Sequence, residues 1–350
     1  MKTFLEIHER YRAPGMDTRH VRHAQVVSLL DKLPAPFTVA PVGRSAENRA
    51  IYGIQAGNGA TRVLLWSQMH GDESTATRTL FDVFSFLAAS DEYDDMRRGI
   101  LSQLSLLFIP MLNPDGAERC RRENAWGIDI NRDALSTTTP EGKILHSQIQ
   151  AFQPFFSFNL HDQESYFSAG VSRIPATIAF LAPPPDAQES LTDSRRRAIQ
   201  LIVALDRKLQ PVIPNGVAKW DDTFEPRAFG EWTQAQNSAA ILIESGGYYN
   251  DPERNFVRRL HFGILLEALR AVAFESYTTE PVAPYFAIPR NRENGLFDTL
   301  RRRQTLTANG VSYTTDIGVR KGETFAGDFD FFGALTDDDG ARLTPDACNP

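Results

Sequence analysis

Short apolar runs bounded by turn-forming residues alternate with amphipathic segments along this chain. Four runs have the length and apolar content of buried strands, at residues 63–67, 104–109, 155–160 and 240–243. Segments with apolar residues at helical spacing separate or flank them, at residues 74–87, 140–152, 190–209 and 253–274. Because strands alternate with helices, the pattern predicts an α/β protein with a largely parallel or mixed sheet.

Weaker signals lie around these segments. Residues 37–42 and 50–56 read as a pair of strands, residues 26–30 as a short helix and residues 177–181 as a further strand. The sequence Asn113-Pro114-Asp115-Gly116 combines the residues that favour chain reversal, so we predict a turn there.

The composition and the hydrophobic pattern of the sequence change after about Tyr277. Three prolines punctuate an extended segment, and beyond it residues 311–319 and 325–335 alternate weakly and are rich in Gly and Asp. We therefore expect a main domain at residues 1–277 and a small β-rich C-terminal extension at residues 278–350. The acidic triplet Asp337–Asp339 is more typical of a solvated turn than of a cation site, which is the alternative.

Composition limits the classes of function. The 350 residues carry 37 basic and 44 acidic side chains, a net charge of −7, which argues against a nucleic-acid-binding protein. No apolar run approaches the ~18 residues of a membrane span. Cys120 and Cys348 are too few for a disulfide framework, and the N-terminal residues lack the apolar core of a signal peptide. We expect a cytoplasmic protein; nothing in the sequence indicates its oligomeric state.

Polar side chains stand where the apolar runs end. His70 and Glu73 follow the run at 63–67, His161 follows the run at 155–160, and Glu244 follows the run at 240–243. Ligand-binding groups gather at the carboxyl ends of strands in α/β sheets. Because zinc accepts both imidazole nitrogen and carboxylate oxygen, His70 and Glu73 are candidate ligands with His161 as a third. Each has another reading: His161 could be a hydrogen-bonded core histidine, and Glu244 a buried ion-pair carboxylate. The remaining histidines, among them His20 and His23, are expected not to bind metal.

The order of these segments resembles the zinc carboxypeptidase family of the carboxypeptidase A type, over roughly residues 37–274. The resemblance implies a three-layer α/β/α sandwich with a twisted, mostly parallel sheet. It also implies one zinc ion per chain, held by His70, Glu73 and His161. The Asn113–Gly116 segment matches a turn of the family.

The resemblance assigns further roles to this sequence. Arg122 matches the arginine that polarises the scissile carbonyl, with Arg121 as the alternative. Asn131 and Arg132 match the pair that grips the carboxylate of the substrate, and Asp129 matches the residue that orients the first histidine ligand. Glu244 matches the general base. The non-catalytic alternatives are that Asp129 only caps a turn and that Arg122 is only a surface charge.

The function implied is that of a metallocarboxypeptidase, a hydrolase that cleaves a peptide or other amide bond next to a free carboxylate. Zinc would activate a water molecule, and Glu244 would take the proton and pass it to the leaving amine. A small-molecule zinc deacylase acting on N-acyl amino acids is the alternative, whereas a non-catalytic scaffold is disfavoured by the complete ligand set.

One feature of the family is missing. It usually has a mobile tyrosine about twenty residues before the base, and residues 218–227 contain none. Tyr166, Tyr248 or Tyr249 could substitute, or Arg227 or Asp222 could face the substrate instead. The absence favours the deacylase slightly, and no residue can be assigned to side-chain specificity.

Overall fold

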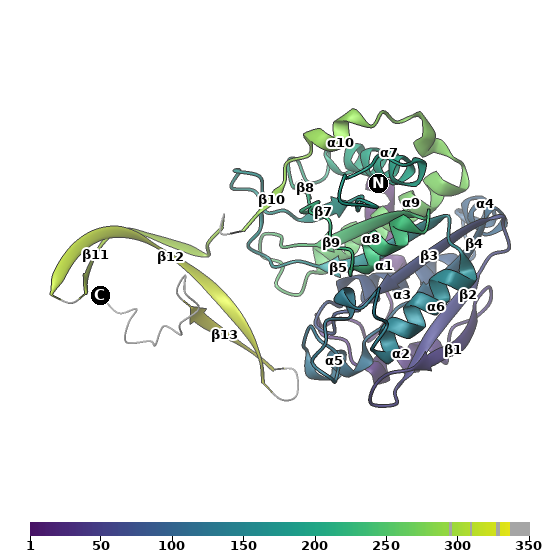
Figure 1. Ribbon diagram of the computed structural model, residues 1–350, viewed down its shortest axis with the longest axis horizontal. Helices are drawn as coiled ribbons and strands as arrows, with labels where there is room; N and C mark the ends of the chain where they lie inside the picture. The colour runs from purple at the N-terminus through teal and green to yellow at the C-terminus, as the bar shows by residue number, and fades with distance from the viewer. Residues whose placement is uncertain (294–295, 309, 327–329, 337–350) are drawn as a thin grey trace. The chain divides into compact units, whose positions relative to one another are not determined.

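A computed structural model of the chain describes residues 1–293, 296–308, 310–326 and 330–336 (Figure 1). It divides into two compact units, Met1–Arg292 and Glu293–Pro350, so residues 278–292 lie in the first. The assignment of catalysis to one part of the chain and not the other stays a prediction. The acidic triplet at 337–339 lies outside the described residues.

The first unit is built on an eight-stranded sheet. Across the sheet the strands are β1 (Thr38–Arg44), β2 (Ala50–Ala56), β4 (Leu104–Ile109), β3 (Thr61–Ser67), β5 (Phe156–Asp162), β9 (Ala239–Ser245), β7 (Ile178–Leu181) and β8 (Val217–Lys219). The central strands β4, β3, β5 and β9 run parallel, and β8 runs parallel to β7. The pairs β1–β2, β2–β4 and β7–β9 are antiparallel, so the predicted mixed, mostly parallel sheet is confirmed.

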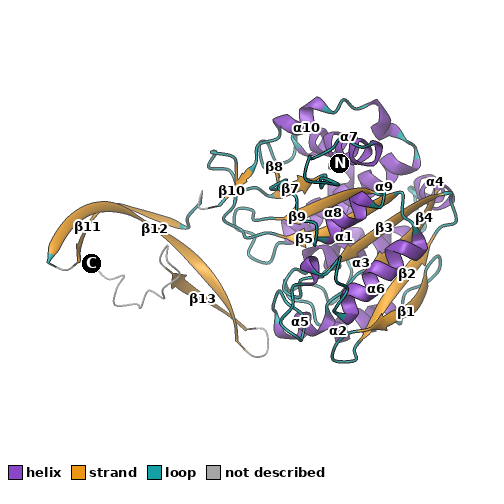
Figure 2. Cartoon of the chain, in the orientation of Figure 1, coloured by secondary structure: helices purple, strands orange, loops and turns teal. Residues whose placement is uncertain are grey.

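Helices cover both faces of this sheet (Figure 2). The larger buried cluster packs one face against α1 (Lys2–Tyr11), α2 (His23–Leu30), α3 (Thr75–Ala88), α4 (Asp94–Gln103), α7 (Asp193–Leu209) and α9 (Asn255–Ala273). A smaller cluster packs the other face against α6 (Pro140–Phe152) and α8 (Phe229–Ala235). Successive side chains of a strand point to opposite faces, and in β3 Val63 and Leu65 enter the larger cluster while Leu64 and Trp66 enter the smaller. The three-layer sandwich is confirmed.

Local sequence explains where several elements begin. Thr139 caps α6 by accepting a hydrogen bond from the Gly142 amide, and Pro140 fits the first helical position. The prediction of a turn at Asn113 was wrong, because the Asn113 side chain caps a short helix, α5 (Pro114–Arg119), through the Gly116 amide at 2.8 Å. The same residue types that favour turns also favour helix starts.

The described part of the second unit is a three-stranded antiparallel sheet of β11 (Thr299–Ala308), β12 (Val311–Ala326) and β13 (Asp330–Thr336). A β-rich C-terminal segment is thus confirmed, although β11 had not been predicted. Over the residues that the structure describes, no helix has the length and hydropathy needed to span a bilayer. The cytoplasmic location stays a prediction.

Candidate metal centre

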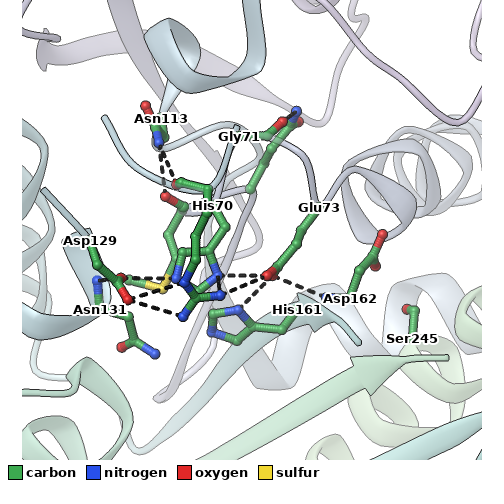
Figure 3. Close-up of polar contacts among 12 residues, drawn as sticks. His70, Gly71, Glu73, Asn113, Asp129, Asn131, His161, Asp162 and Ser245 are labelled. Atoms are coloured by element: carbon green, nitrogen blue, oxygen red, sulfur yellow. Dashed lines mark hydrogen bonds and ion pairs between the residues drawn. The ribbon is translucent and has the colours of Figure 1, made fainter. Parts of the chain in front are cut away.

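The predicted metal ligands converge at the carboxyl ends of adjacent parallel strands. His70 and Glu73 lie in the turn between β3 and α3, and His161 lies near the end of β5 (Figure 3). The Nδ1 atom of His70 is 2.7 Å from Glu73 Oε1, and the Nδ1 atom of His161 is 2.8 Å from Glu73 Oε2. Among the described residues this is the one group of donor atoms close enough to share an ion, with all three within 4.8 Å.

Burial and charge both act on these groups. Burial lowers the pKa of His70, but the carboxylates of Glu73 and Asp129 outweigh it and raise the pKa to about 9. Burial raises the pKa of Glu73, yet the two histidines hold that pKa far below its usual value. Burial lowers the pKa of His161, with Glu73 opposing. In this state Glu73 is therefore ionised and His70 holds the proton that an ion would replace.

The residues present fit a zinc ion. Asp129 Oδ1 lies 3.0 Å from His70 Nε2, which fixes the tautomer and leaves Nδ1 to face Glu73. Two imidazoles and one carboxylate are a donor set that catalytic zinc sites use with a fourth position open. The nearby Glu244 Oε2 is buried without a hydrogen-bond partner in the described structure, as expected beside a position that a ligand fills.

Glu244 is the neighbour of His161 across the sheet. The two residues are register partners on β5 and β9, so the strand pairing itself sets their separation. Glu244 is buried, and its burial, reinforced by the charge of Glu73, raises the pKa of its carboxyl well above the usual value. A carboxyl group with a raised pKa next to a metal position is suited to proton transfer.

Arg122 joins the cluster from the segment that follows α5. Its Nη2 and Nε atoms donate to Asp129 Oδ2 at 3.0 and 3.2 Å, and its Nη1 atom donates to Glu73 Oε1 at 3.3 Å. The guanidinium therefore points at the metal ligands. Its first alternative, Arg121, is not among the residues that line the cavity described below.

Asn131 and Arg132 lie on a single 3₁₀ turn, η1 (Ile130–Arg132), which Asp129 caps through the Asn131 amide at 2.8 Å. Asn131 is buried, and its Oδ1 atom accepts a hydrogen bond from the amide of Phe229 at 2.9 Å. Arg132 is exposed, and its Nη1 atom donates to the Asn131 carbonyl at 2.7 Å. The turn thus holds an exposed guanidinium beside the metal ligands.

One cavity of about 120 Å³ brings these side chains together. Its walls are His70, Glu73, Arg122, Asn131, Arg132, His161, Asp162, Trp220, Leu242 and Glu244. Every predicted site residue is in this set except Asp129, which lies behind His70.

Three residues of the wall had no role assigned from the sequence. Asp162 supports the metal ligands, because its amide donates to Glu73 Oε2 at 3.1 Å and its carboxylate accepts from Thr75 Oγ1 at 2.7 Å. Its position directly after His161 was a usable signal. Trp220 and Leu242 gave no signal, since apolar residues on a strand or beside one are ordinarily core residues.

The substitutes considered for the missing tyrosine lie elsewhere. The cavity wall includes none of the candidate tyrosines, nor Arg227 or Asp222. Tyr248 packs against Phe256 with ring centroids 4.1 Å apart, and Asp222 accepts from Lys219 Nζ at 3.0 Å. Trp220 is the aromatic residue that this segment places in the wall.

The remaining histidines lie outside the cluster. Within the described structure each has another contact: His8 with Asp82, His20 with Cys120, His23 with the Ala50 carbonyl, His146 with Trp232 and His261 with Ser245. None belongs to a second group of donor atoms in the described residues.

Comparisons with known proteins agree with this geometry. The zinc carboxypeptidase family profile matches residues 24–167, which contain His70, Glu73 and His161. Carboxypeptidase D of Rattus norvegicus is 30% identical over an alignment 163 residues long, which covers 39% of this chain and 11% of that protein. The matched stretch is about a fifth or less of the length of each curated relative.

Solved structures show the same fold. The metallo-carboxypeptidase of Burkholderia cenocepacia superposes with a TM-score of 0.61 at 16% identity, covering 74% of this chain and 70% of that one. The metallo-carboxypeptidase of Pseudomonas aeruginosa, in complex with (2-guanidinoethylmercapto)succinic acid, gives a TM-score of 0.60 with the same identity and coverage. The donor set and the profile agree on zinc as the cofactor, and residues 24–167 of the chain match the zinc carboxypeptidase family in sequence.

Proposed function

We propose that this protein is a metallocarboxypeptidase that hydrolyses an amide bond next to a free carboxylate. The observation that carries the proposal is one cavity whose wall combines a His-Glu-His donor set with Glu244, Arg122 and Arg132. These groups supply metal binding, proton transfer, charge stabilisation and carboxylate recognition in one place.

The roles follow from the contacts. A bound zinc ion would supply a Lewis acid and lower the pKa of water at the site towards ~7. Glu244, whose Oε2 atom is buried without a hydrogen-bond partner in the described structure, would accept a proton from that water and return it to the leaving amine. The Arg122 guanidinium, fixed by Asp129, donates towards the oxygen of the scissile carbonyl as negative charge develops there.

Arg132 and Asn131 would hold the substrate. A guanidinium forms two parallel hydrogen bonds with a carboxylate, which a lysine cannot do. The Pseudomonas aeruginosa relative was solved with a derivative of succinic acid, a ligand that carries carboxylates. That ligand supports carboxylate recognition in this fold, and for this chain the anchor is proposed to be Arg132.

The test compares peptides that end in a free carboxylate with the same peptides as C-terminal amides. A charge-assisted hydrogen bond contributes ~1.5–3 kcal/mol, so amidation should lower kcat/KM about ten- to a hundredfold. For the free-acid peptide, the kcat/KM of Arg132→Lys should lie between these two values, because lysine keeps the positive charge but cannot form two parallel hydrogen bonds. Equal rates for free and amidated peptides would refute the carboxypeptidase assignment.

A zinc deacylase of N-acyl amino acids is the second candidate. The size of the cavity favours it, because about 120 Å³ is below the ~300–1,000 Å³ of pockets that enclose drug-sized ligands. Trp220 also occupies the wall in the segment where the family has a mobile tyrosine. Mass spectrometry of products from a peptide library and from N-acyl amino acids separates the two functions. A deacylase would leave the peptides intact.

A further inference from the structure

Arg132 already has a carboxylate beside it in this structure. The Oε2 atom of Glu225 lies 3.6 Å from Arg132 Nε, on the segment 220–228 that joins β8 to α8. The side chains are 40% exposed for Arg132 and 28% exposed for Glu225, so a ligand can reach both. The position that the proposed function gives to a substrate carboxylate is therefore partly taken by a side chain of the protein itself.

Backbone contacts hold Glu225 at this place. The Arg227 carbonyl accepts from the Ala134 amide at 3.0 Å, and the Glu225 carbonyl accepts from the Ala228 amide at 2.9 Å. The next residue, Phe229, donates to Asn131 Oδ1. The segment is thus attached to the η1 turn at Asn131 and just beyond the turn at Ala134, and Glu225 lies beside Arg132 because of the fold.

A second arginine competes for the same carboxylate. Arg227 Nε donates to Glu225 Oε1 at 2.9 Å, and Arg227 Nη2 donates to Glu225 Oε2 at 2.7 Å, which is a two-pronged pair. The Arg132 contact is single and longer. Arg227 foremost, with Arg132 adding to it, lowers the pKa of Glu225 to about 2, so the carboxylate is charged at neutral pH.

We propose that Glu225 is an internal competitor for the carboxylate anchor, and that Arg227 sets how strongly it competes. When a substrate carboxylate arrives at Arg132, Glu225 gives up its weaker partner and stays paired with Arg227. The exchange costs little, since a partly exposed ion pair at this distance is weak. The inference rests on the proposed role of Arg132 and makes Glu225 a specificity residue for carboxylate substrates.

Two single variants should act in opposite directions. Glu225→Gln removes the competing charge and keeps the size of the side chain, so KM for a free-acid substrate should fall about two- to fivefold. Arg227→Gln releases Glu225 to pair with Arg132 alone, so KM should rise about three- to tenfold. In the double variant, Arg227→Gln should no longer raise KM, because the competing carboxylate of Glu225 is absent. The value of kcat should be the same in the wild type, in both single variants and in the double variant.

Binding gives a readout that does not depend on turnover. Calorimetric titration of zinc-loaded protein with N-acetylglycine should show tighter binding to Glu225→Gln and weaker binding to Arg227→Gln. N-acetylglycinamide lacks the carboxylate and should not distinguish the variants. Asp221→Asn removes one charge from the same segment at an exposed residue that contacts Thr223, and it should leave binding unchanged.

The outcomes separate this inference from the proposed function. If the wild type hydrolyses neither peptides nor N-acyl amino acids while N-acetylglycine binding follows the expected order, the proposed function fails and the competition stands. If Glu225→Gln weakens binding, or if both variants shift it in the same direction, Glu225 is an attractive or structural contact and the inference is overturned.

Discussion

At the scale of single residues, the metal centre depends on which ring nitrogen of each histidine faces Glu73. Asp129 accepts a hydrogen bond from His70 Nε2, so the Nδ1 atom of His70 faces Glu73. Arg122, in the cavity wall, donates to the same carboxylate. Asp129 therefore connects the ligand that would hold zinc with the side chain proposed to stabilise charge.

Glu244 is the residue for which the structure makes the sharpest chemical prediction. Glu244→Gln should keep zinc and lower kcat roughly 10²–10⁴-fold, because the amide is nearly isosteric but cannot take a proton. Steady-state kinetics with elemental analysis of the same samples provide the measurement. A variant that keeps a near-normal rate would show that another group acts as the base.

Zinc affinity should depend on pH through His70. The pKa of its imidazole is raised to about 9 in this state, so below that pH the ring carries a proton that zinc must displace. The apparent association constant should rise about tenfold per pH unit from pH 6 to 8 and level off near pH 9. Competition against a chelator at several pH values measures this, and a flat profile would contradict it.

The same measurement has matched histidine controls. His161→Ala removes one donor atom and should lose zinc at every pH. His146→Ala alters a histidine that stacks on Trp232 outside the cluster, and it should bind zinc as the wild type does. Equal zinc content in the two variants would remove His161 from the ligand set.

At the scale of elements, the accuracy of the sequence predictions followed the strength of the apolar signal. The strand at 104–109 and the helix at 140–152 were predicted with the boundaries that the structure shows, because each has a buried apolar pattern and clear end signals. The predicted metal ligands lie close together because each follows such a strand. Glu225 was not found, since no pattern marks which charged residue of a loop faces a distant turn.

The helices that were missed have identifiable reasons. Helix α4 buries only Arg97 and Ile100, so its sequence lacks an apolar stripe, and α8 spans only seven residues with Gly230 near its start. Helix α1 has buried residues at helical spacing, and its signal was overlooked. Tertiary packing, more than local preference, stabilises α4 and α8.

A buried ion pair joins α3 to α9 beside the end of α1. Asp82 on α3 and Arg258 on α9 are both fully buried, and Asp82 also accepts from the Ala13 amide just after α1 at 2.8 Å. Asp82→Asn should lower the free energy of unfolding by about 3–5 kcal/mol, because it leaves a buried arginine charge uncompensated. Urea denaturation measures the loss, and a change below about 1 kcal/mol would show that the pair is dispensable.

At the scale of the whole molecule, the apolar core belongs to one part of the chain. Within the described residues, all three clusters of buried apolar side chains lie in Met1–Arg292. The predicted metal and substrate residues lie there too.

A chain ending at Arg292 should therefore fold and bind zinc with unchanged affinity. The reason is that a unit with its own hydrophobic core can fold alone. Circular dichroism and chelator competition on the shortened and full-length proteins test this. Loss of cooperative unfolding in the shortened chain would show that the second unit is needed for stability.

The pairing of His161 with Glu244 across β5 and β9 has a consequence for engineering. His161 and Glu244, which are proposed to bind the metal and to transfer the proton, lie on the hydrogen-bond ladder of the sheet, whereas the residues proposed to recognise the substrate lie on the η1 turn and the 220–228 segment. A new loop grafted between β8 and α8 should therefore change the proposed substrate specificity and leave the residues proposed for the reaction in place. The architecture places residues proposed for the reaction on the sheet and residues proposed for substrate recognition on loops that can be exchanged.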